Sequence, residues 1–422
     1  MNDILNKQIP QLVALITLEM TNRADKKQYW ADFKNRRNSE LCQILGIDPA
    51  WGLQAGSLIG FDIDEDRQLI LLNYSSAAHN LLHEIDGGWT PVLRQLRGLV
   101  YAWEKPGVVA GVKLVSRGFE KFFNQSELPE TQMEALADQA GNERIMCSAK
   151  EDGHMIEYFL HNRKLCATTR GRLDTPSATE ALGMIQRSTF IKSQVVAKRY
   201  GKELMSLVCE FIHPMTRVHV DYGGDKKLFL LEAYDAQGEA VGYEVLRAIA
   251  GELDDYFVLP EMRRMTLQEL DAEINRRSVQ NREGWVAQVP DGTGGFRRVK
   301  FKYIAYIGEM VKSKLSYKYL MSCIKNDRLD KMLITLPEEI RGVAHDMVRE
   351  IVAATNAGTN DGSDYKTLYE LHTPNEGSVE NFRNVCRGYY RHVLSAYESS
   401  GTKKLQLNAA VTAGRISVTQ VL

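Results

Sequence analysis

The residues best suited to covalent chemistry lie in the tetrapeptide Lys150-Glu151-Asp152-Gly153, where a lysine follows an apolar run and precedes a turn with glycine. Alternation over residues 155–160 predicts a strand that leaves this turn. A lysine in such a place can act as a nucleophile if burial or a neighbouring cation lowers its pKa enough to leave some amine unprotonated. The spacing alone also fits an ordinary hairpin with an exposed lysine, so a chemical role requires further residues.

A second set of candidates is the row of cations at residues 297–303, which follows a glycine-rich turn at residues 291–295. Strict alternation along a strand places Arg298, Lys300 and Lys302 on one face and the apolar residues on the other. Neighbouring lysines on one strand face repel each other unless an anion lies over both. The two interpretations are therefore an exposed, solvated face and a site for a polyphosphate.

Carboxylates occur at two places where strands are predicted. Glu210 lies in the apolar run at residues 207–212, and a buried carboxylate there is unfavourable unless a cation, a hydroxyl or a metal ion meets it. An exposed edge strand would remove that requirement. Glu283 precedes Gly284 and the apolar run of a further predicted strand.

Two more cations stand near predicted strands in the first third of the chain. Arg97 and Gly98 come directly before an apolar run, which predicts a strand that begins beside the arginine. Lys121 lies between the aromatic residues Phe119 and Phe122. It is either a functional cation or a lysine whose stem runs along an aromatic core while its ammonium reaches water.

Composition limits the class of protein and its partners. The chain has 422 residues, 44% of them hydrophobic and 25% charged, which is ordinary for a soluble globular protein. Its formal net charge of −1 gives no overall attraction to nucleic acid, so any basic surface must be local. The apolar stretch at residues 12–18 is too short to span a bilayer and lacks a signal-peptide cleavage pattern, so we expect a cytoplasmic protein.

The cysteines and histidines do not indicate a metal site. The six cysteines are scattered without a Cys-x-x-Cys pair, and several lie in apolar runs, which fits reduced thiols in a cytosolic core. His79 and His83 are four residues apart, but Asn80 stands where a zinc protease has glutamate, and no third ligand is evident. We therefore expect both histidines to be helix-surface or core residues.

Residue patterns divide the chain into a helical start, a strand-rich middle and a helical end. Helical spacing of apolar residues covers residues 1–50, and the pattern is again helical from residue 306 to about residue 399. Between these parts, Ser177-x-x-Glu180 predicts a helix that reaches about Lys198, and Thr266-x-x-Glu269 predicts another. The other predicted strands lie at residues 69–74, 98–103, 108–115, 165–169 and 228–233.

Lys150 with its Asp-Gly, the strand carboxylate Glu210, the pair Glu283-Gly284 and the two lysines follow one another in an order that resembles the covalent nucleotidyltransferases. That superfamily comprises the polynucleotide ligases and the mRNA-capping guanylyltransferases. Within it, the chain is most similar to the RNA ligase 1 family, the phage-type ATP-dependent RNA ligases. The resemblance covers roughly residues 74–306.

The resemblance implies an α+β fold, in which a nucleotidyltransferase domain of antiparallel sheets with flanking helices is followed by an α-helical C-terminal domain. DNA ligases and capping enzymes continue instead into a small β-barrel, which would require short alternating strands after Lys302. We expect residues 1–55 to be the N-terminal helical part of the nucleotidyltransferase domain. The other expected parts are an adenylyltransferase core at 56–308, the helical C-terminal domain at 309–400 and a tail at 401–422.

The resemblance also implies roles for individual residues. Lys150 corresponds to the lysine that becomes linked to AMP, Lys300 and Lys302 to the pair that grips the α-phosphate, and Glu283 to a carboxylate that helps to hold Mg²⁺ or Mn²⁺. The residues expected to bind the nucleotide are Tyr74, Arg97, Lys121, Phe123, Glu210, Glu283, Lys300 and Lys302. Further candidate metal ligands are Asp152, Asp327 and Asp330. Candidate RNA contacts are Arg170 (where the family often has lysine), Lys312, Lys318, Arg383, Arg387 and Arg391. All of them except Arg170 also fit a solvated helix face.

The function implied by the resemblance is that of an ATP-dependent RNA ligase. Lys150 would attack the α-phosphate of ATP, AMP would pass to an RNA 5′-phosphate, and a 3′-hydroxyl would seal the strand and release AMP. Lys300 and Lys302 would neutralise the α-phosphate and lower the pKa of Lys150 by repulsion. The expected partners are broken RNAs such as cleaved tRNA, and an end-healing kinase or phosphatase, with no membrane. Two alternatives remain open: a catalytically inactive RNA-binding protein of the same fold, and a GTP-using RNA guanylyltransferase.

Overall fold

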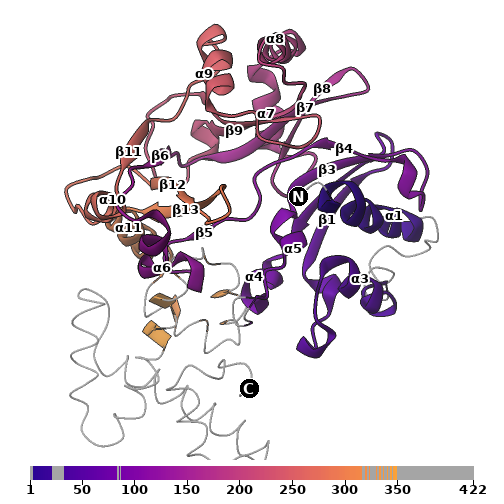
Figure 1. Cartoon of the computed structure of the whole chain (residues 1–422), viewed down its shortest axis with the longest axis horizontal. Helices are drawn as coiled ribbons and strands as arrows, with labels where there is room; N and C mark the ends of the chain where they lie inside the picture. The colour runs from indigo at the N-terminus through magenta and orange to yellow at the C-terminus, as the bar shows by residue number, and fades with distance from the viewer. Residues whose placement is uncertain are drawn as a thin grey trace, which may run out of the picture. The chain divides into compact units, whose positions relative to one another are not determined.

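The computed structural model describes residues 3–20, 33–82, 85 and 87–315, together with scattered positions between 319 and 348. The chain divides into two units, Met1–Tyr303 and Ile304–Leu422, which we describe separately (Figure 1). Within the described residues, no helix is long and apolar enough to cross a membrane.

Several predictions therefore fall outside the described residues. They concern most of the helical C-terminal domain, the tail, Lys318, Asp327, Asp330, Arg383, Arg387 and Arg391. The second unit begins with helix α11 (Ile304–Lys314), which contains Lys312, but the side chain of Lys312 is not described. The domain boundaries expected from the sequence stay predictions.

The N-terminal sheet is an antiparallel meander with helices packed against one face. Its strands, in spatial order, are β1 (Ile59–Asp64), β2 (Leu69–Tyr74), β3 (Arg97–Trp103) and β4 (Val112–Ser116). The helices and helical turns around it are η1 (Ile4–Gln8), α1 (Ile9–Met20), α3 (Asn38–Leu45), η2 (Pro49–Trp51), η3 (Ala55–Ser57), α4 (Ser76–Leu82), α5 (Pro91–Gln95) and η4 (Val109–Gly111). Leu12 and Ile16 lie on one stripe of α1 and are buried in the same cluster as Leu72 of β2.

The strand predicted at residues 108–115 is wrong in its first half. The amide of Glu104 donates to the carbonyl of Gly111, and the amide of Val108 donates to Lys105, so residues 105–111 form the connection between β3 and β4. The apolar residues Val108 and Val109 belong to this connection, and pairing with β3 begins only at Val112.

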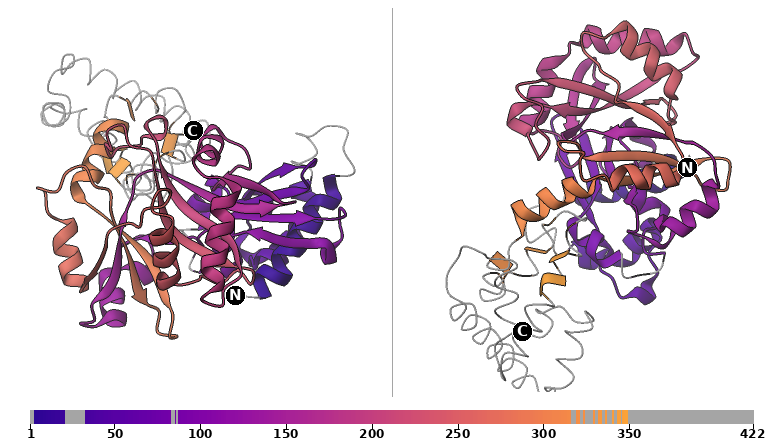
Figure 2. Two further views of the ribbon diagram at one scale, coloured as in Figure 1. Left: turned by 90° about the horizontal axis from the view of Figure 1, so that it is seen from above. Right: turned by 90° about the vertical axis from the view of Figure 1, so that its left-hand side faces the viewer.

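A second sheet, here called the helix-covered sheet, carries helices on one face. Its strands, in spatial order, are β10 (Lys227–Asp235), β9 (Leu204–Ile212), β7 (His154–His161) and β8 (Lys164–Thr169). The helices are α7 (Pro176–Met184), α8 (Arg187–Lys198) and α9 (Tyr243–Glu252), and the turn after β9 is η6 (Pro214–Thr216). These helices lie over one face of the sheet (Figures 1 and 2). Cys209 and Phe211 of β9 are buried in one cluster with residues of the helices. By the alternation of a strand, Glu210 and its partner Met155 on β7 point to the opposite face.

The helix predicted from Ser177 to about Lys198 is two helices with a different cap. The Thr175 hydroxyl, rather than that of Ser177, accepts a hydrogen bond from the first turn, and proline follows it at the first helical position. The Ser177 hydroxyl lies 2.9 Å from Nδ1 of His154 instead. The backbone is extended at Ile185 between α7 and α8, and this break places the Ile185 side chain in the buried cluster under the helices.

The third sheet, here called the five-stranded sheet, contains the lysine tetrapeptide at one strand end. Its strands, in spatial order, are β11 (Met262–Met265), β6 (Ile145–Lys150), β12 (Gly284–Pro290), β13 (Phe296–Lys302) and β5 (Phe123–Asn124), with only β13 and β5 parallel. Its helices and turns are η5 (Pro129–Thr131), α6 (Met133–Ala140) and α10 (Leu267–Ile274). The capping box predicted at Thr266 and Glu269 is confirmed, because each side chain accepts a hydrogen bond from the other's amide.

Strand pairing in the five-stranded sheet brings the predicted lysines onto one face. Gly284 of β12 pairs with Lys150 on one side and with Lys302 on the other. Directly paired residues point to the same face of a sheet, so these two lysines share a face, and Lys300, two residues earlier on β13, shares it too. This arrangement agrees with the alternation predicted for residues 297–303.

The cysteines agree with the sequence-based expectation as far as the structure describes them. The described cysteines are buried free thiols, at positions 42, 147, 166, 209 and 323. His79 is buried in α4, whereas His83 lies outside the described residues.

The position of Gly284 generates a prediction for stability. A Cβ on Gly284 would come within 3.0 Å of the backbone of Phe301 and Lys302 in the neighbouring strand, so Gly284→Ala must push β12 and β13 apart. We expect thermal or urea unfolding to show a loss of about 2 kcal/mol. The matched control is Gly183→Ala in α7, where a Cβ meets nothing within 4 Å, and we expect that variant to gain up to about 1 kcal/mol. Equal stabilities of the two variants would contradict the close approach of the strands.

Candidate active site

One buried carboxylate joins Lys150 and Lys302, which together with Lys300 are here called the lysine row. Glu283 Oε2 lies 2.8 Å from Nζ of Lys150, and Glu283 Oε1 lies 2.7 Å from Nζ of Lys302. The Glu283 side chain is 3% exposed and that of Lys302 is 9% exposed, whereas Lys150 retains 22%, so a molecule from solvent can reach the Lys150 amine. The arrangement is a pair of ammonium groups held around an anion at the end of three strands.

Lys300 and Arg97 both lie close to the ring of Phe122. Nζ of Lys300 is 5.2 Å from the centroid of the Phe122 ring, and the guanidinium carbon of Arg97 is 5.5 Å from the same centroid. Arg97 Nη1 also donates a hydrogen bond to Sδ of Met155 at 3.2 Å. Burial lowers the pKa of Arg97. The ordinary pKa of arginine is so high that the guanidinium is still charged.

Glu210 lies on the far side of the lysine tetrapeptide. Its Oε1 accepts a hydrogen bond from the amide of Gly153 at 3.0 Å, so the carboxylate meets the turn that follows Lys150. Burial raises the pKa of Glu210 to about 7, and Glu283 adds to the rise, while Lys150, the Gly153 amide and Arg97 oppose it. The sequence-based argument that a carboxylate in this strand needs a partner is answered by an amide and two cations.

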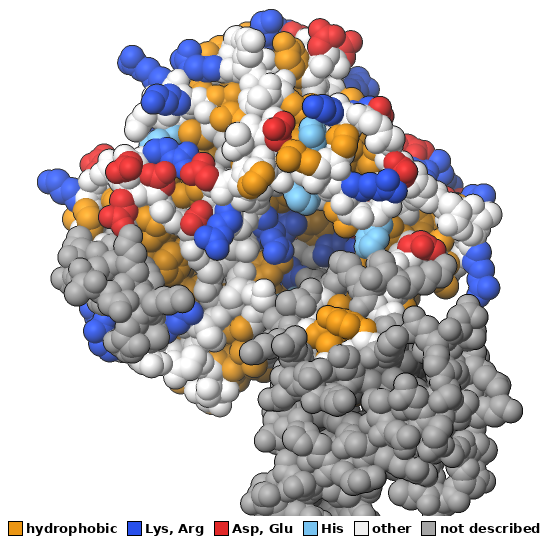
Figure 3. Space-filling view, turned by 180° about the vertical axis from the view of Figure 1, so that it is seen from behind, with side chains coloured by type: hydrophobic (Ala, Val, Ile, Leu, Met, Phe, Trp, Pro, Cys, Tyr) orange, Lys and Arg blue, Asp and Glu red, His pale blue; other side chains and the backbone are white. Residues whose placement is uncertain are grey.

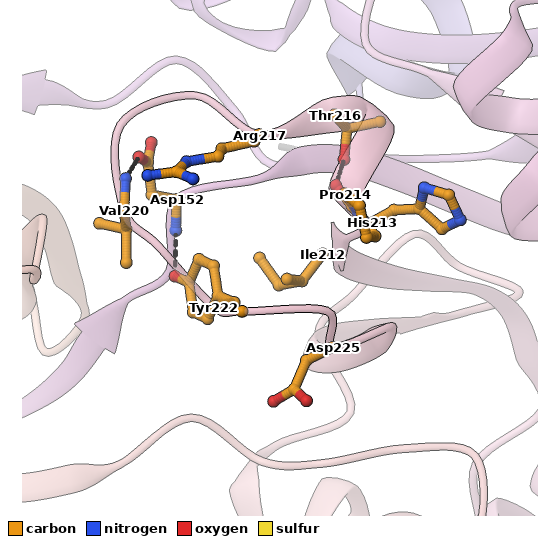
Figure 4. A pocket seen from close by; sticks show the side chains of 10 residues that line it. Asp152, Ile212, His213, Pro214, Thr216, Arg217, Val220, Tyr222 and Asp225 are labelled. Carbon is orange, nitrogen blue, oxygen red and sulfur yellow. Dashed lines mark hydrogen bonds between the residues drawn. The ribbon is translucent and has the colours of Figure 1, made fainter.

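Asp152 holds a loop against the tetrapeptide. Its Oδ2 accepts hydrogen bonds from the amides of His219 and Val220, both at 2.8 Å. Figure 4 shows the bond from Val220. The Tyr222 hydroxyl accepts from the amide of Asp152 at 2.8 Å and donates to Oε2 of Glu151 at 2.9 Å. Asp152, which the sequence suggested as a metal ligand, therefore anchors the loop at residues 213–225.

The same loop is held a second time, beside Glu283. The side chain of Asn281 accepts from the amide of Asp221 at 2.6 Å and donates to its carbonyl at 2.7 Å. Asn281 adopts a positive φ of 57°, a conformation that asparagine tolerates better than most residues. The loop thus connects the turn after Lys150 with the segment that leads into Glu283.

A second cluster of predicted residues surrounds Lys121. Its side chain is 1% exposed, and its Nζ lies 4.7–5.5 Å from the ring centroids of Tyr74, Trp89 and Phe123. Glu127 supplies the counter-charge, with Oε1 at 3.6 Å from Nζ. The snorkelling lysine that the sequence allowed is therefore wrong, because this ammonium lies inside the protein.

Arg170 lies beside the same cluster. Its Nη1 donates to the Tyr74 hydroxyl at 3.0 Å, and its guanidinium carbon is 5.3 Å from the Tyr74 ring centroid. Arg97 links this cluster to the lysine row, since its charge interacts with Tyr74 and Arg170 as well as with Glu210. The structure thus brings together all of the residues expected to bind a nucleotide, in two neighbouring groups that meet at Arg97.

A polyphosphate with its metal ion needs a basic surface and one or two carboxylates. Figure 3 shows Lys and Arg side chains, with His side chains among them, around a recess in one face of the described molecule. The residues that the structure describes contain no cluster of three or more His, Cys, Asp or Glu side chains that could hold a metal ion by itself. Mg²⁺ commonly binds through one or two carboxylates plus substrate phosphates. Glu283 pairs with two lysines, so it could bind a metal ion only if phosphates replaced it as the partner of those lysines.

Sequence reasoning missed the residues that position the tetrapeptide. No residue pattern around Tyr222 indicates that its hydroxyl bonds to the Asp152 amide and to the Glu151 carboxylate, about seventy residues away. Asn281 precedes Glu283 by two residues, and an asparagine before a predicted strand is a turn signal that could have been read as a left-handed residue. Glu127, the partner of Lys121, carried no signal.

Comparisons with known proteins find RNA ligases. The family model described as RNA ligase matches residues 95–306. A Thermovibrio ammonificans protein named "Putative RNA ligase" is 28% identical over 200 residues, which are 47% of this chain and 48% of that protein. The chain therefore matches about half the length of this curated relative.

Two solved structures with low identity are also RNA ligases. An archaeal ATP-dependent RNA ligase is 13% identical, with a TM-score of 0.41 over 71% of this chain and 70% of that chain. A mutant of the Naegleria gruberi RNA ligase with ATP and Mn is 14% identical, with a TM-score of 0.32 over 42% of this chain and 54% of that chain.

The anchoring of the loop can be tested through backbone exchange. In Asp152→Asn the side chain loses its charge and becomes a weaker acceptor for the amides of His219 and Val220. We expect hydrogen–deuterium exchange of peptides covering residues 213–222 to rise about tenfold, because weakening these bonds costs about 1.5 kcal/mol. The matched control is Asp225→Asn in the same loop, whose carboxylate pairs with exposed Lys227. Equal exchange in both variants would contradict the anchor.

Proposed function

We propose that this chain, which belongs to the RNA ligase family, is an ATP-dependent RNA ligase that joins 5′-phosphate and 3′-hydroxyl RNA ends through a lysyl-AMP intermediate. The observation that carries the proposal is the row formed by Lys150 and Lys302 around Glu283, with Lys300 on the same sheet face. A reachable amine beside further cations is the arrangement that transfer of a phosphate to lysine requires.

The first step forms a bond between Lys150 and the α-phosphorus of ATP. The unprotonated amine attacks phosphorus, the bond to the pyrophosphate oxygen breaks in line, and the amine's remaining excess proton goes to solvent or a nearby carboxylate. Pyrophosphate leaves, and a phosphoramidate joins Lys150 to AMP. Glu283 holds the Lys150 amine in place before the nucleotide binds, at 2.8 Å.

The cations stabilise charge where it develops during this step. Lys302 and Lys300 lie on the same sheet face as Lys150, so they can donate hydrogen bonds to the α-phosphate oxygens when the nucleotide binds. A Mg²⁺ or Mn²⁺ ion held by Glu283 and the phosphates would neutralise the leaving pyrophosphate. Arg97 and Lys121 would serve the nucleotide beyond these lysines, and Lys121 would do so from inside the protein, where its ammonium lies over the Tyr74 ring.

The second and third steps use the activated AMP. An oxygen of an RNA 5′-phosphate attacks the phosphorus of lysyl-AMP, which frees Lys150 and leaves AMP on the RNA end. A 3′-hydroxyl then attacks the RNA phosphorus, forms the phosphodiester bond and releases AMP. Broken RNA with such ends, as in RNA or tRNA repair after an end-healing kinase or phosphatase has acted, would be the substrate.

Incubation with α-labelled ATP and Mg²⁺ tests the first step. We expect acid-labile label on the unchanged protein, and none above background on Lys150→Ala or Lys150→Arg. The arginine variant keeps a cation beside Glu283, so loss of label there reflects loss of the nucleophile rather than of the ion pair. The control is Lys164→Ala, since Lys164 is exposed at a hairpin turn. Label that persists on Lys150→Ala would refute the proposal.

The acceptor and the base distinguish this proposal from its alternatives. We expect sealing of a single-stranded or nicked RNA that carries a 5′-phosphate, with ATP preferred to GTP. Labelling by GTP with transfer to a 5′-diphosphate end would identify a guanylyltransferase instead. RNA binding with no label from either nucleotide would identify an inactive RNA-binding protein.

A further inference from the structure

Glu157 is a buried carboxyl that has no part in the proposed reaction. It lies on β7 and is 0% exposed. Its Oε2 accepts a hydrogen bond from the Ser116 hydroxyl at 2.6 Å, and this bond crosses from the helix-covered sheet to the end of β4 in the N-terminal sheet. Its Oε1 is buried and accepts no hydrogen bond from any residue that the structure describes. A carboxyl in such a place is costly, so its presence calls for a function.

Two glycines make room for the Oε1 atom. A Cβ on either Gly98 or Gly118 would come within 3.0 Å of this oxygen, so the backbone of β3 and of the segment after β4 both press against the carboxyl. Gly98 also has a positive φ of 83°, which disfavours any side chain there. Gly98 directly follows Arg97, so the carboxyl packs against the residue next to Arg97.

Glu157 and the Arg97 contact lie on one face of β7. Met155, whose sulfur accepts a hydrogen bond from Arg97, precedes Glu157 by two residues and so points to the same face. The charge of Glu157 interacts with Arg97 in both directions: each stabilises the ionised form of the other. Glu157 is therefore electrostatically coupled to a guanidinium of the nucleotide site.

The other neighbours of Glu157 can be named from each element packed against it. Arg117, which directly follows β4, also lowers the pKa of Glu157, to a smaller extent than Arg97. The Arg117 guanidinium donates hydrogen bonds to the side chain of Gln95, at 3.0 Å, and to the carbonyl of Gly238. The flanking strands β8 and β9 present the uncharged residues Thr168 and Val208 in the paired positions. Ionisation of Glu157 therefore acts mainly on Arg97, whose positive charge it partly offsets.

We propose that Glu157 is a positioning residue that holds the Arg97 segment across the two sheets and competes with nucleotide phosphates for the Arg97 charge, so that it makes nucleotide binding depend on pH. The inference rests on the proposed function, because it takes the anion near Arg97 to be a nucleotide. A neutral Glu157 leaves the full Arg97 charge to the phosphates, whereas an ionised Glu157 offsets part of it.

The direction of the pH dependence follows from linkage. Burial raises the pKa of Glu157 to about 8, while Ser116, Arg97 and Arg117 oppose the rise. A bound polyphosphate adds negative charge near the carboxyl and raises this pKa further. Nucleotide binding is therefore tightest where Glu157 is protonated, and it weakens as the pH rises through the pKa of the free protein.

The test compares ATP binding by two full-length proteins. Lys150→Ala prevents transfer of AMP, and the second protein adds Glu157→Gln, which keeps the shape and the acceptor for Ser116. The Kd of ATP with Mg²⁺ is measured by calorimetry from about pH 6.5 to about pH 9.5, on either side of the expected transition. We expect the Kd of the first protein to rise about tenfold more than that of the second, since a pKa shift of one unit corresponds to a factor of ten.

A third protein, Lys150→Ala with Ser116→Ala, checks the cause. It keeps the carboxyl but removes the hydrogen bond that favours its ionised form, so the transition is expected to move to higher pH. An equal pH dependence with and without Glu157→Gln, or a weakening by the same factor at every pH, would overturn the inference while leaving the proposed function intact. Absence of ATP binding at every pH would instead contradict the proposed function.

Discussion

The site depends on the carboxylate of Glu283, which lies between two ammonium groups. Lys302 is nearly buried and Glu283 is almost fully buried, and such charges are tolerated inside a protein only when each is paired. Lys300 lies on the same face and adds a third ammonium group to this part of the sheet. In the proposed reaction, the phosphate of a nucleotide joins these cations as a further anion. Glu283 thus holds the Lys150 amine in place, and under the proposed function a nucleotide phosphate would replace Glu283 as its partner.

Backbone geometry keeps this cluster in register. Gly284 lies between Lys150 and Lys302 in the strand row, and its missing side chain allows β12 and β13 to approach closely. Asp152 and Asn281 hold one loop at two points, one beside Lys150 and one beside Glu283. These hydrogen bonds go to backbone groups, so they position the turn without engaging the side chains of Lys150 and Lys302. The site is thus prepared by its scaffold before any substrate binds.

Short-range patterns predicted many of the strands and helices, whereas most residues of the candidate site came from the resemblance to a known family. Alternation placed Lys300 and Lys302 on one face, and the capping box at Thr266 was correct, because both depend on residues that are neighbours in the chain. The helix at residues 177–198 was wrong because a buried Ile185 interrupts it, and burial is a property of the tertiary structure.

Long-range contacts could not be predicted from the residues alone. The pairing of β6 with β12 joins segments more than a hundred residues apart, and the shared use of Glu283 by both lysines follows from it. The same is true of the bond between Ser116 and Glu157, which crosses two sheets. A glutamate within an alternating strand gives no sign of whether it meets water or an arginine of the site.

The exchange of an anion at the lysine row is the central claim, and it can be observed directly in a crystal structure of the full chain with a non-hydrolysable ATP analogue and Mg²⁺. The account predicts that the α-phosphate lies within hydrogen-bond distance of Lys150 and Lys302, and that Glu283 has turned from the lysines towards the cation. A nucleotide bound elsewhere, with Glu283 still bridging both ammonium groups, would contradict it.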